Sequence, residues 1–398
     1  MSIRGIYQSN QGIVGERVGD FASAILMVDP TGTAPMLAMT SGMPNRPAGD
    51  TIFHWFEDAH ISGNTTATSG GTGTTIGVTD SSVYVPGTVL MVEDTGEYLL
   101  VDGVTDSQIT VLRGLAGTAI VAITNGMTLQ NVGNAHEEGS NRPTAVAQQG
   151  APRLNYTQIF RNGWAVTGTA KAVKFLTGSK LAKNKMDCAK YHAEDKERAI
   201  LFSKKHIGTR NGKQFRMTDG LLTQIEQYGG IVESATDGTT AGNYSWLLFN
   251  DWIRRLFKKN VKGQPNERIA FCGDVALQVI NNFALADSEY NLEANETELG
   301  IMITTVKTPF GKLKMMTHPL MTENARWAKE LYAFHPGGIA RRTLRETFEE
   351  NYDTNGNRID GVDADEGLIT TEMGVECGAA QTMGILRNLN KAVVSDFN

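Results

Sequence analysis

The order of strand-like and helical segments is the feature that most constrains the fold of this chain. Short runs rich in Val, Ile, Leu and Thr fill the region before residue 132, whereas long amphipathic segments that favour helices occur only after residue 180. Further short strand patterns follow these helices, so the chain lacks the strict strand–helix alternation of a doubly wound sheet. This order predicts the α+β class, with helices set against antiparallel strands.

Residues 64–131 have the pattern of a small separate β-module. The module opens with a stretch of Gly, Thr and Ser over residues 64–75, which we interpret as a flexible linker. Strand patterns follow at residues 89–92, 97–104 and 108–113, and Asp-Thr-Gly and Thr-Asp-Ser supply the turns between them. Strands repeated at intervals of roughly ten residues predict a small barrel or sandwich.

Three segments have the periodicity of amphipathic helices. Residues 183–206 predict a long helix that ends at Gly208. Residues 245–260 predict a second helix with Ser245 as its N-cap, and residues 274–286 predict a third. The remaining patterns predict one hairpin followed by short strands, at residues 301–307, 312–317, 331–334, 343–348, 368–371 and 375–385.

The beginning of the chain contains little that could form a core of its own. Residues 1–49 are punctuated by Gly, Pro and Asn, and we interpret them as an extended arm that packs on something else. The next segment, residues 50–62, is strand-like and aromatic, and its rings have little local cover. Burial of one such ring contributes about 1.5–3 kcal/mol, so neighbouring subunits are the expected cover. The subunit-contact candidates are Phe53, His54, Trp55, Phe56 and Glu57.

Charge is distributed in three blocks, although the formal net charge at pH 7 is only −6. Residues 1–152 carry a net charge of −9, residues 153–217 carry +11 and residues 218–398 carry −8. The basic block predicts a surface that faces a polyanion, and a solvated helix surface explains the same pattern equally well. Under the first interpretation, four lysines contact phosphate without reading bases: Lys183, Lys190, Lys204 and Lys205.

The chain contains no catalytic, cofactor or metal motif with the required spacing. Residues 208–214 lack the glycine spacing of a Walker loop and the Ser or Thr that reaches magnesium. Residues 353–365 resemble a calcium loop, but Arg358 and Ala364 occupy the positions that need Gly and Glu. An acidic surface loop is the favoured interpretation, and a cation site is the alternative. We therefore predict no catalytic, cofactor-binding or metal-binding residues, and no enzymatic activity.

Cysteine usage and hydropathy bear on where the protein resides. The three cysteines, Cys188, Cys272 and Cys377, are far apart in the chain. Their spacing excludes a disulfide scaffold and fits a reducing compartment. No apolar run approaches the 18 residues that a membrane-spanning helix needs, and the first residues lack the apolar core of a signal peptide. We therefore expect no membrane partner.

Six motifs occur in a recognisable order after residue 86. They are GTVLMVEDTGEYLLV (residues 87–101), NYTQIFRNGWAVTGTA (155–170), AEDKERAIL (193–201), RMTDGLL (216–222), TPFGKLKMMTHPLM (308–321) and EMGVECGAAQTMGILRNL (372–389). In this order they resemble the major capsid proteins of tailed phages, specifically the SU-ten-like family, which has the Hong Kong 97-like fold.

The resemblance implies five structural parts. They are an N-terminal arm (residues 1–49), an extended loop (50–63 and 132–152), an inserted β-domain (64–131), a peripheral domain with the spine helix and returning strands (153–224 and 331–398), and an axial domain (225–330). An arm without its own core and an aromatic ribbon suit a subunit that is completed by its neighbours.

The resemblance also implies a function. The chain would be a major capsid protein that self-assembles, as hexamers and pentamers, into the icosahedral shell around the double-stranded DNA genome of a tailed bacteriophage. The four lysines of the basic block would then face the packaged genome and contact it non-specifically. Because the chain starts at Met1, a separate scaffolding protein is expected, and a portal and a decoration protein are further expected partners. Assembly would take place in the host cytoplasm, and the product would be the virion capsid.

Two other classes of protein are alternatives. A tail-tube or surface-array subunit could carry the same β-module, and an enzyme could assemble its site only in three dimensions. The long helix at residues 183–206 favours the capsid class, because tube proteins are mostly β.

Overall fold

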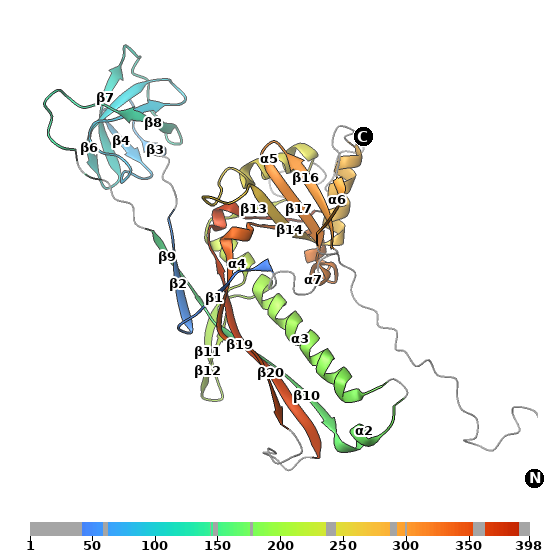
Figure 1. Cartoon of the computed structure of the whole chain (residues 1–398). Coiled ribbons are helices and arrows are strands. Elements are labelled where there is room, and N and C mark those ends of the chain that lie inside the picture. The colour runs from blue at the N-terminus through green and yellow to red at the C-terminus, as the bar shows by residue number, and fades with distance from the viewer. Residues whose placement is uncertain are drawn as a thin grey trace, which may run out of the picture. The chain divides into compact units, whose positions relative to one another are not determined.

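A computed structural model describes residues 42–58, 63–143, 145, 150–175, 178–235, 244–286, 293–298, 301–352 and 363–389. Most of the predicted arm and residues 353–362 of the acidic loop therefore lie outside the described residues. The chain divides into two compact units: one comprises Met1–Trp55 and Leu154–Asn398, and the other comprises Phe56–Arg153 (Figure 1). In the described part of the chain, no helix combines the length and the apolar character needed to cross a membrane.

The unit Phe56–Arg153 contains a closed β-barrel with the strand order β3-β4-β7-β6-β5-β8. Its strands are β3 (Thr65–Ser69), β4 (Thr75–Val78), β5 (Thr88–Val92), β6 (Tyr98–Thr105), β7 (Gln108–Leu115) and β8 (Thr128–Asn134). Alternate apolar side chains, among them Ile76, Leu90 and Leu99, fill its core. Closure leaves no strand edge unpaired. The strands predicted at residues 89–113 are confirmed, and β8 extends past the predicted module boundary at residue 131.

The prediction of a flexible linker at residues 64–75 is wrong, because this stretch contains the barrel strand β3. Thr65 and Ala67 point into the barrel, and β3 pairs with β4 on one side and β8 on the other. A Cβ at Gly77 would lie 2.5 Å from the Ser69 hydroxyl oxygen, so glycine permits the close approach of β3 and β4. Linkers and closely paired strands share a Thr and Gly composition, and only the pairing distinguishes them.

The larger unit contains a four-stranded sheet with the order β1-β19-β20-β10. The strands are β1 (Asn45–Pro47), β10 (Gln158–Thr167), β19 (Ile339–Tyr352) and β20 (Ala364–Cys377). The long helix α3 (Lys180–Phe202) lies along β10 (Figure 1). Ile200 and Leu201 of α3 and Val375 of β20 belong to one apolar core, which holds the helix on the sheet. The shorter helices of this unit include α2 (Gly168–Ala172), α4 (Leu221–Gln227) and α7 (Pro319–Thr322).

A seven-stranded mixed sheet is the second large sheet of this unit, in the order β13-β21-β18-β14-β17-β16-β15. Its strands are β13 (Ile231–Ser234), β14 (Glu267–Cys272), β15 (Glu293–Glu298), β16 (Ile301–Thr308), β17 (Gly311–Thr317), β18 (Leu331–Phe334) and β21 (Gly384–Arg387). Helices α5 (Trp246–Leu256) and α6 (Asp274–Ala286) share one apolar core with it. The Ser245 hydroxyl accepts the Leu248 N–H, which confirms the predicted N-cap of α5.

The long helix is shifted relative to the prediction at residues 183–206. It begins after Ser179, whose hydroxyl accepts the Ala182 N–H, and it ends at Phe202. Gly208 is therefore not a helix terminus but part of a hairpin, β11 (His206–Arg210) paired with β12 (Lys213–Met217). Asn211 and Gly212 form its tip with φ angles of 52° and 71°. Such positive angles suit an Asn-Gly hairpin turn.

The strands predicted at residues 343–348 and 368–371 are parts of longer elements. The single strand predicted at residues 375–385 is wrong, because a segment with a 3-10 helix at Ala380–Thr382 separates two strands there. β19 and β20 have 14 residues each, and β20 ends at Cys377, before the separate strand β21. Their pairing shifts register between Thr343 and Arg345 and again between Arg345 and Phe348. Charged residues on these strands interrupt the apolar alternation on which the prediction depended.

A separate two-stranded sheet pairs β2 (Ile52–Glu57) with β9 (Ala151–Tyr156). Three short 3-10 helices complete the described elements, at Trp327–Lys329, Pro336–Gly338 and Ala380–Thr382.

Candidate subunit-contact and genome-facing surfaces

The aromatic strand β2 presents its rings to two different environments. Phe53 and Trp55 are each only 6% exposed, whereas His54 is exposed and Phe56 is 76% exposed. Alternation along a strand places neighbouring side chains on opposite faces. Glu57 is half-buried and lies 3.7 Å from Arg153, measured from Oε2 to Nε.

The prediction that Phe53 and Trp55 lack cover within the chain is wrong. The two rings stack with centroids 6.1 Å apart, and the edge of Tyr228 meets Trp55 at 6.3 Å. The guanidinium of Arg342 lies 5.8 Å from the Phe53 ring centroid. These covering residues are far from β2 in the sequence, so no local pattern could reveal them. Among the β2 candidates, His54 and Phe56 retain exposed side chains, and their role as subunit contacts stays a prediction.

The four predicted lysines do not share one element. Lys183 and Lys190 lie two turns apart on α3, whereas Lys204 and Lys205 follow its end. Lys205 Nζ lies 3.8 Å from the buried Asp219 carboxylate and 6.0 Å from the Tyr228 ring centroid. Lys204 is exposed, and Lys183 borders a hollow of about 470 Å³ between α3 and the end of β10. Lys183 and Lys204 are therefore the better-placed cations for an external polyanion.

The opposite face of α3 is anchored to the sheets by buried polar groups. His192 Nδ1 lies 2.7 Å from Asn162 Oδ1, and its Nε2 lies 2.8 Å from the Thr371 hydroxyl. Burial, and then the nearby Lys196, lower the pKa of His192 to about 4. His318 Nε2 lies 3.3 Å from Glu197 Oε1, and both side chains are fully buried. These groups are inaccessible to a substrate, so their role is to hold the helix in place.

Ion pairs across the four-stranded sheet form a feature that sequence reasoning missed. Glu376 accepts hydrogen bonds from Arg342 at 2.5 Å and from Arg46 at 2.8 Å. Glu372, four residues before Glu376 on β20, accepts a hydrogen bond from Arg345 at 2.7 Å. Arg46 belongs to β1, so its ion pair ties the end of the predicted arm (residues 1–49) to the sheet of the same chain. The available signal was the presence of arginines at 342 and 345 and glutamates at 372 and 376, which pattern analysis for a core ignores.

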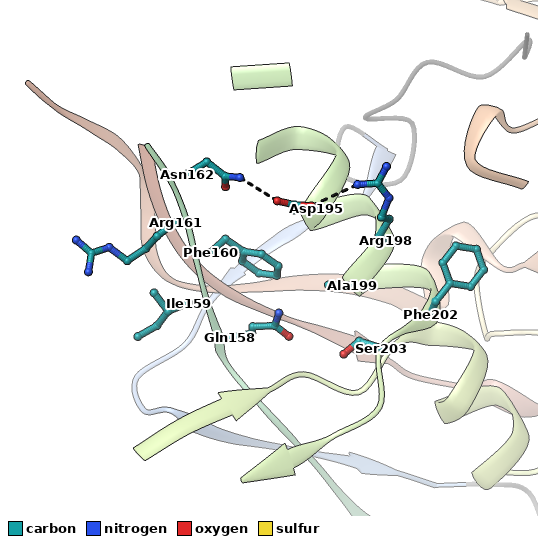
Figure 2. Close-up of a pocket in the computed structure, with 10 residues that line it drawn as sticks. All are labelled: Gln158, Ile159, Phe160, Arg161, Asn162, Asp195, Arg198, Ala199, Phe202 and Ser203. Carbon is teal, nitrogen blue, oxygen red and sulfur yellow. Dashed lines mark hydrogen bonds and ion pairs between the residues drawn. The ribbon is translucent and has the colours of Figure 1, made fainter. Parts of the chain in front are cut away.

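A second hollow of about 470 Å³ lies between β10 and α3 (Figure 2). Asp195 of α3 receives hydrogen bonds from Asn162 at 2.9 Å and from Arg198 at 3.3 Å. The other residues that line the hollow are Gln158, Ile159, Phe160, Arg161, Ala199, Phe202 and Ser203. These residues form no nucleophile–base pair, so the hollow offers no evident chemistry.

Possible metal ligands and the three thiols are the remaining candidates for a reactive site. Within the described ranges, no group of three or more His, Cys, Asp or Glu residues is arranged to hold a metal ion. All three cysteines are buried, and none of them forms a disulfide. Burial, and then Asp274, raise the pKa of the Cys272 thiol to about 12, and burial also raises the pKa of Cys188. Thiols in such surroundings are inert.

The fold of the chain is similar to that of solved capsid subunits. It is similar to the capsid of a native GTA particle, with 7% identity, a TM-score of 0.50, and coverage of 96% of this chain and 99% of that chain. The capsid of Myoviridae phage XM1 aligns over 97% of this chain and all of that chain, with 11% identity and a TM-score of 0.48. The similarity to the GTA capsid shows that the fold belongs to the Hong Kong 97-like class.

Sequence comparison then identifies the family. The family model of the SU10 major capsid protein matches residues 6–390. The major capsid protein of Pseudomonas phage PaMx41 is 30% identical, over 94% of this chain and 92% of that protein. The chain therefore belongs to the SU10 major capsid protein family. The predicted family, the Hong Kong 97-like α+β fold and the function as a tailed-phage major capsid protein are confirmed, and the tail-tube alternative is set aside.

Proposed function

We propose that copies of this chain assemble, as hexamers and pentamers, into the icosahedral shell that encloses the double-stranded DNA of a tailed phage. Membership of the SU10 major capsid protein family over residues 6–390 carries the proposal. The family consists of structural subunits, and the absence of enzymatic activity stays a prediction. Scaffolding, portal and decoration proteins and assembly in the host cytoplasm belong to the same proposal.

We assign each proposed part of the subunit to a group of structural elements. The four-stranded sheet with α3 would form the peripheral domain, the seven-stranded sheet the axial domain, and the barrel the inserted domain. Strands β2 and β9 would belong to the extended loop. One adjustment follows from the sheet order: β18 and β21 belong to the seven-stranded sheet, although both lie beyond residue 330.

Electron microscopy of the purified full-length chain tests the shell proposal directly. We expect closed shells, because a major capsid protein buries its unpartnered surfaces against copies of itself. A solution that contains only discrete monomers, over a range of protein and salt concentrations, would contradict self-assembly. Stacked rings without closure would favour a tube subunit instead.

Contact with packaged DNA is the second part of the proposal, and Lys183 and Lys204 are its leading candidates. We expect the double variant Lys183→Glu with Lys204→Glu to bind duplex DNA more weakly than the unmodified protein. Each lost phosphate contact makes the negative slope of log affinity against log salt shallower by about 0.9. The magnitude of the slope should therefore decrease by about 2 in the double variant. Fluorescence anisotropy with a labelled duplex at several salt concentrations measures both quantities.

The matched control for this experiment reverses two other exposed lysines, Lys258 and Lys262, which lie outside the basic block. It makes the same change in net charge, so a general electrostatic effect would weaken DNA binding equally in both variants. Equal slopes would show that Lys183 and Lys204 are ordinary solvated cations. Unchanged melting temperatures in both variants would establish that the folds are intact.

A further inference from the structure

The outer surface of the barrel carries a continuous apolar face. Inward residues of β5, β6 and β7 fill the core, so the alternate residues point outward. The outward positions on these three adjacent strands include polar residues such as Asp102 and Thr110, and five that are apolar. We call the apolar five the barrel face: Val89, Met91, Tyr98, Leu100 and Leu112.

The strand register makes this face contiguous. Val89 lies opposite Leu100, and Met91 lies opposite Tyr98. Leu100 in turn lies opposite Leu112, whose side chain is 54% exposed. The other four side chains are half-buried. Contiguous apolar patches at the surface of soluble domains mark interaction sites. The barrel core does not need these residues, because it is already filled from the inward positions.

Acidic residues border the barrel face at both ends. Asp102 is exposed on β6, Asp106 is exposed in the turn between β6 and β7, and Glu93 and Asp94 are exposed where β5 turns into β6. The whole unit Phe56–Arg153 contains ten acidic residues and three arginines. Two barrel faces would repel each other, so the complementary partner is an apolar surface bordered by cations.

The hairpin β11–β12 has such a surface. In its register Gly208 lies opposite Phe215 and Arg210 lies opposite Lys213, so these side chains share one face with His206. We call these five residues the hairpin face. Arg210 and Lys213 are exposed, and no acidic residue occurs between Arg198 and Asp219.

An exposed aromatic ring occupies the middle of the hairpin face. Phe215 is 41% exposed, and its ring centroid lies 5.7 Å from that of His206. A Cβ at Gly208 would lie 2.6 Å from Phe215 Cε1, so glycine lets the ring lie flat across the neighbouring strand. The hairpin face therefore combines an apolar centre with two cations at its tip.

We propose that the hairpin face of one copy docks onto the barrel face of a second copy in the assembled shell. Phe215 packs against the apolar strands, and Arg210 and Lys213 approach the carboxylates at one end of the barrel face. This inference rests on the proposed function, since it requires a shell of many copies. Duplex DNA would attract the same cations, but its stacked bases offer no apolar surface to the Phe215 ring. The barrel face offers an apolar surface together with negative charge at its ends.

Charge reversal at the hairpin tip tests the contact. We expect Arg210→Glu with Lys213→Glu to raise the protein concentration needed for half-maximal assembly at least tenfold at low salt. Sedimentation velocity and electron microscopy measure this concentration. Lys258→Glu with Lys262→Glu makes the same charge change away from the hairpin and should assemble like the unmodified chain. Phe215→Ala should also weaken assembly, with an effect that does not depend on salt, because the lost contact is apolar.

Compensating reversals in the same chain make the test specific. Adding either Asp102→Lys with Asp106→Lys or Glu93→Lys with Asp94→Lys should restore assembly of the hairpin variant. The pair that restores it identifies the end of the barrel face that the hairpin tip meets. If neither pair restores assembly, or if the hairpin variant assembles normally, the proposal is overturned.

Two further outcomes separate this inference from its alternatives. Normal assembly of the hairpin variant combined with weaker duplex binding in anisotropy would assign the hairpin to DNA and overturn the contact between copies. Failure of the unmodified chain to form shells would contradict the proposed function itself. Unchanged melting temperatures of the hairpin and control variants exclude misfolding as the cause of either result.

Discussion

Replacing Glu97 by alanine is expected to destabilise the barrel by about 3–5 kcal/mol, which is the usual cost of removing one partner of a buried ion pair. The Glu97 and Arg113 side chains are 0% and 3% exposed and lie 2.6 Å apart, from Oε2 to Nη2. Burial alone would raise the pKa of Glu97, but the hydrogen bond and charge of Arg113, together with the N–H groups of Val121 and Gly114, outweigh it, and the pKa is lowered. Without the carboxylate, the guanidinium would remain charged in a site with little access to water.

The same pair also binds the chain segments that follow β3 and β7. Arg113 donates to the carbonyl oxygens of Gly71 at 2.8 Å and Val121 at 2.5 Å. Glu97 accepts the N–H groups of Gly114 and Val121, each at 3.3 Å. Loss of Glu97 should therefore loosen the chain on both sides of the pair. Hydrogen exchange read by mass spectrometry can follow barrel peptides separately from the rest of the molecule.

The control for this prediction is Glu93→Ala, which removes an exposed carboxylate from the same barrel. Surface substitutions of this kind usually change stability by no more than about 0.5 kcal/mol. Equal exchange rates in the Glu97 and Glu93 variants would show that the buried pair contributes little. Adding Arg113→Met to the Glu97 variant should recover part of the loss, because no unpaired charge then remains.

Acidification from pH 6.5 to about 4 is expected to remove roughly 3 kcal/mol of stability for each of two buried histidines, His192 and His335. These side chains are 2% and 1% exposed. Burial, and then a neighbouring cation, lower both pKa values to about 4, with Lys196 beside His192 and Arg268 beside His335. In the unfolded chain a histidine takes up its proton near pH 6.5.

The sign of this effect follows from the proton balance. Below pH 6.5 the histidines bind protons in the unfolded state but not in the folded state. Their contribution to the free energy of unfolding is therefore fully present above pH 6.5 and declines as the pH falls. Asn162 donates its amide N–H to Asp195, so its oxygen faces His192 and the neutral ring carries its proton on Nδ1. His335 Nδ1 accepts the Gly337 N–H, so its proton lies on Nε2 toward Asn260.

Urea unfolding at several pH values between 7 and 4 measures this dependence. His192→Gln and His335→Gln should each flatten the pH profile, even where they lower stability at pH 7, because glutamine does not titrate. The exposed His54→Gln is the matched control and should leave the profile unchanged. A profile that keeps its slope in the double glutamine variant would assign the acid sensitivity to other groups.

Local patterns in the sequence were sufficient for several elements. Alternating Val, Leu and Ile with short polar turns predicted the strands between residues 89 and 113, since each strand pairs with its neighbour through a short turn. The serine before an amphipathic run predicted the N-cap of α5. The ordered motifs predicted the family, which the family model over residues 6–390 confirms.

The burial of Phe53 and Trp55, the full length of β19 and β20 and the end of α3 could be decided only by the tertiary structure. Phe53 is covered by Arg342, and Arg46 meets Glu376 across more than 300 residues of sequence. Contacts at such separations leave no local periodicity, and a charged residue paired across a sheet has the same sequence signature as one in water. The sequence by itself therefore determined the family, the fold class and the basic block. Only the three-dimensional pairing decided which aromatic and charged side chains remain available to a neighbouring subunit.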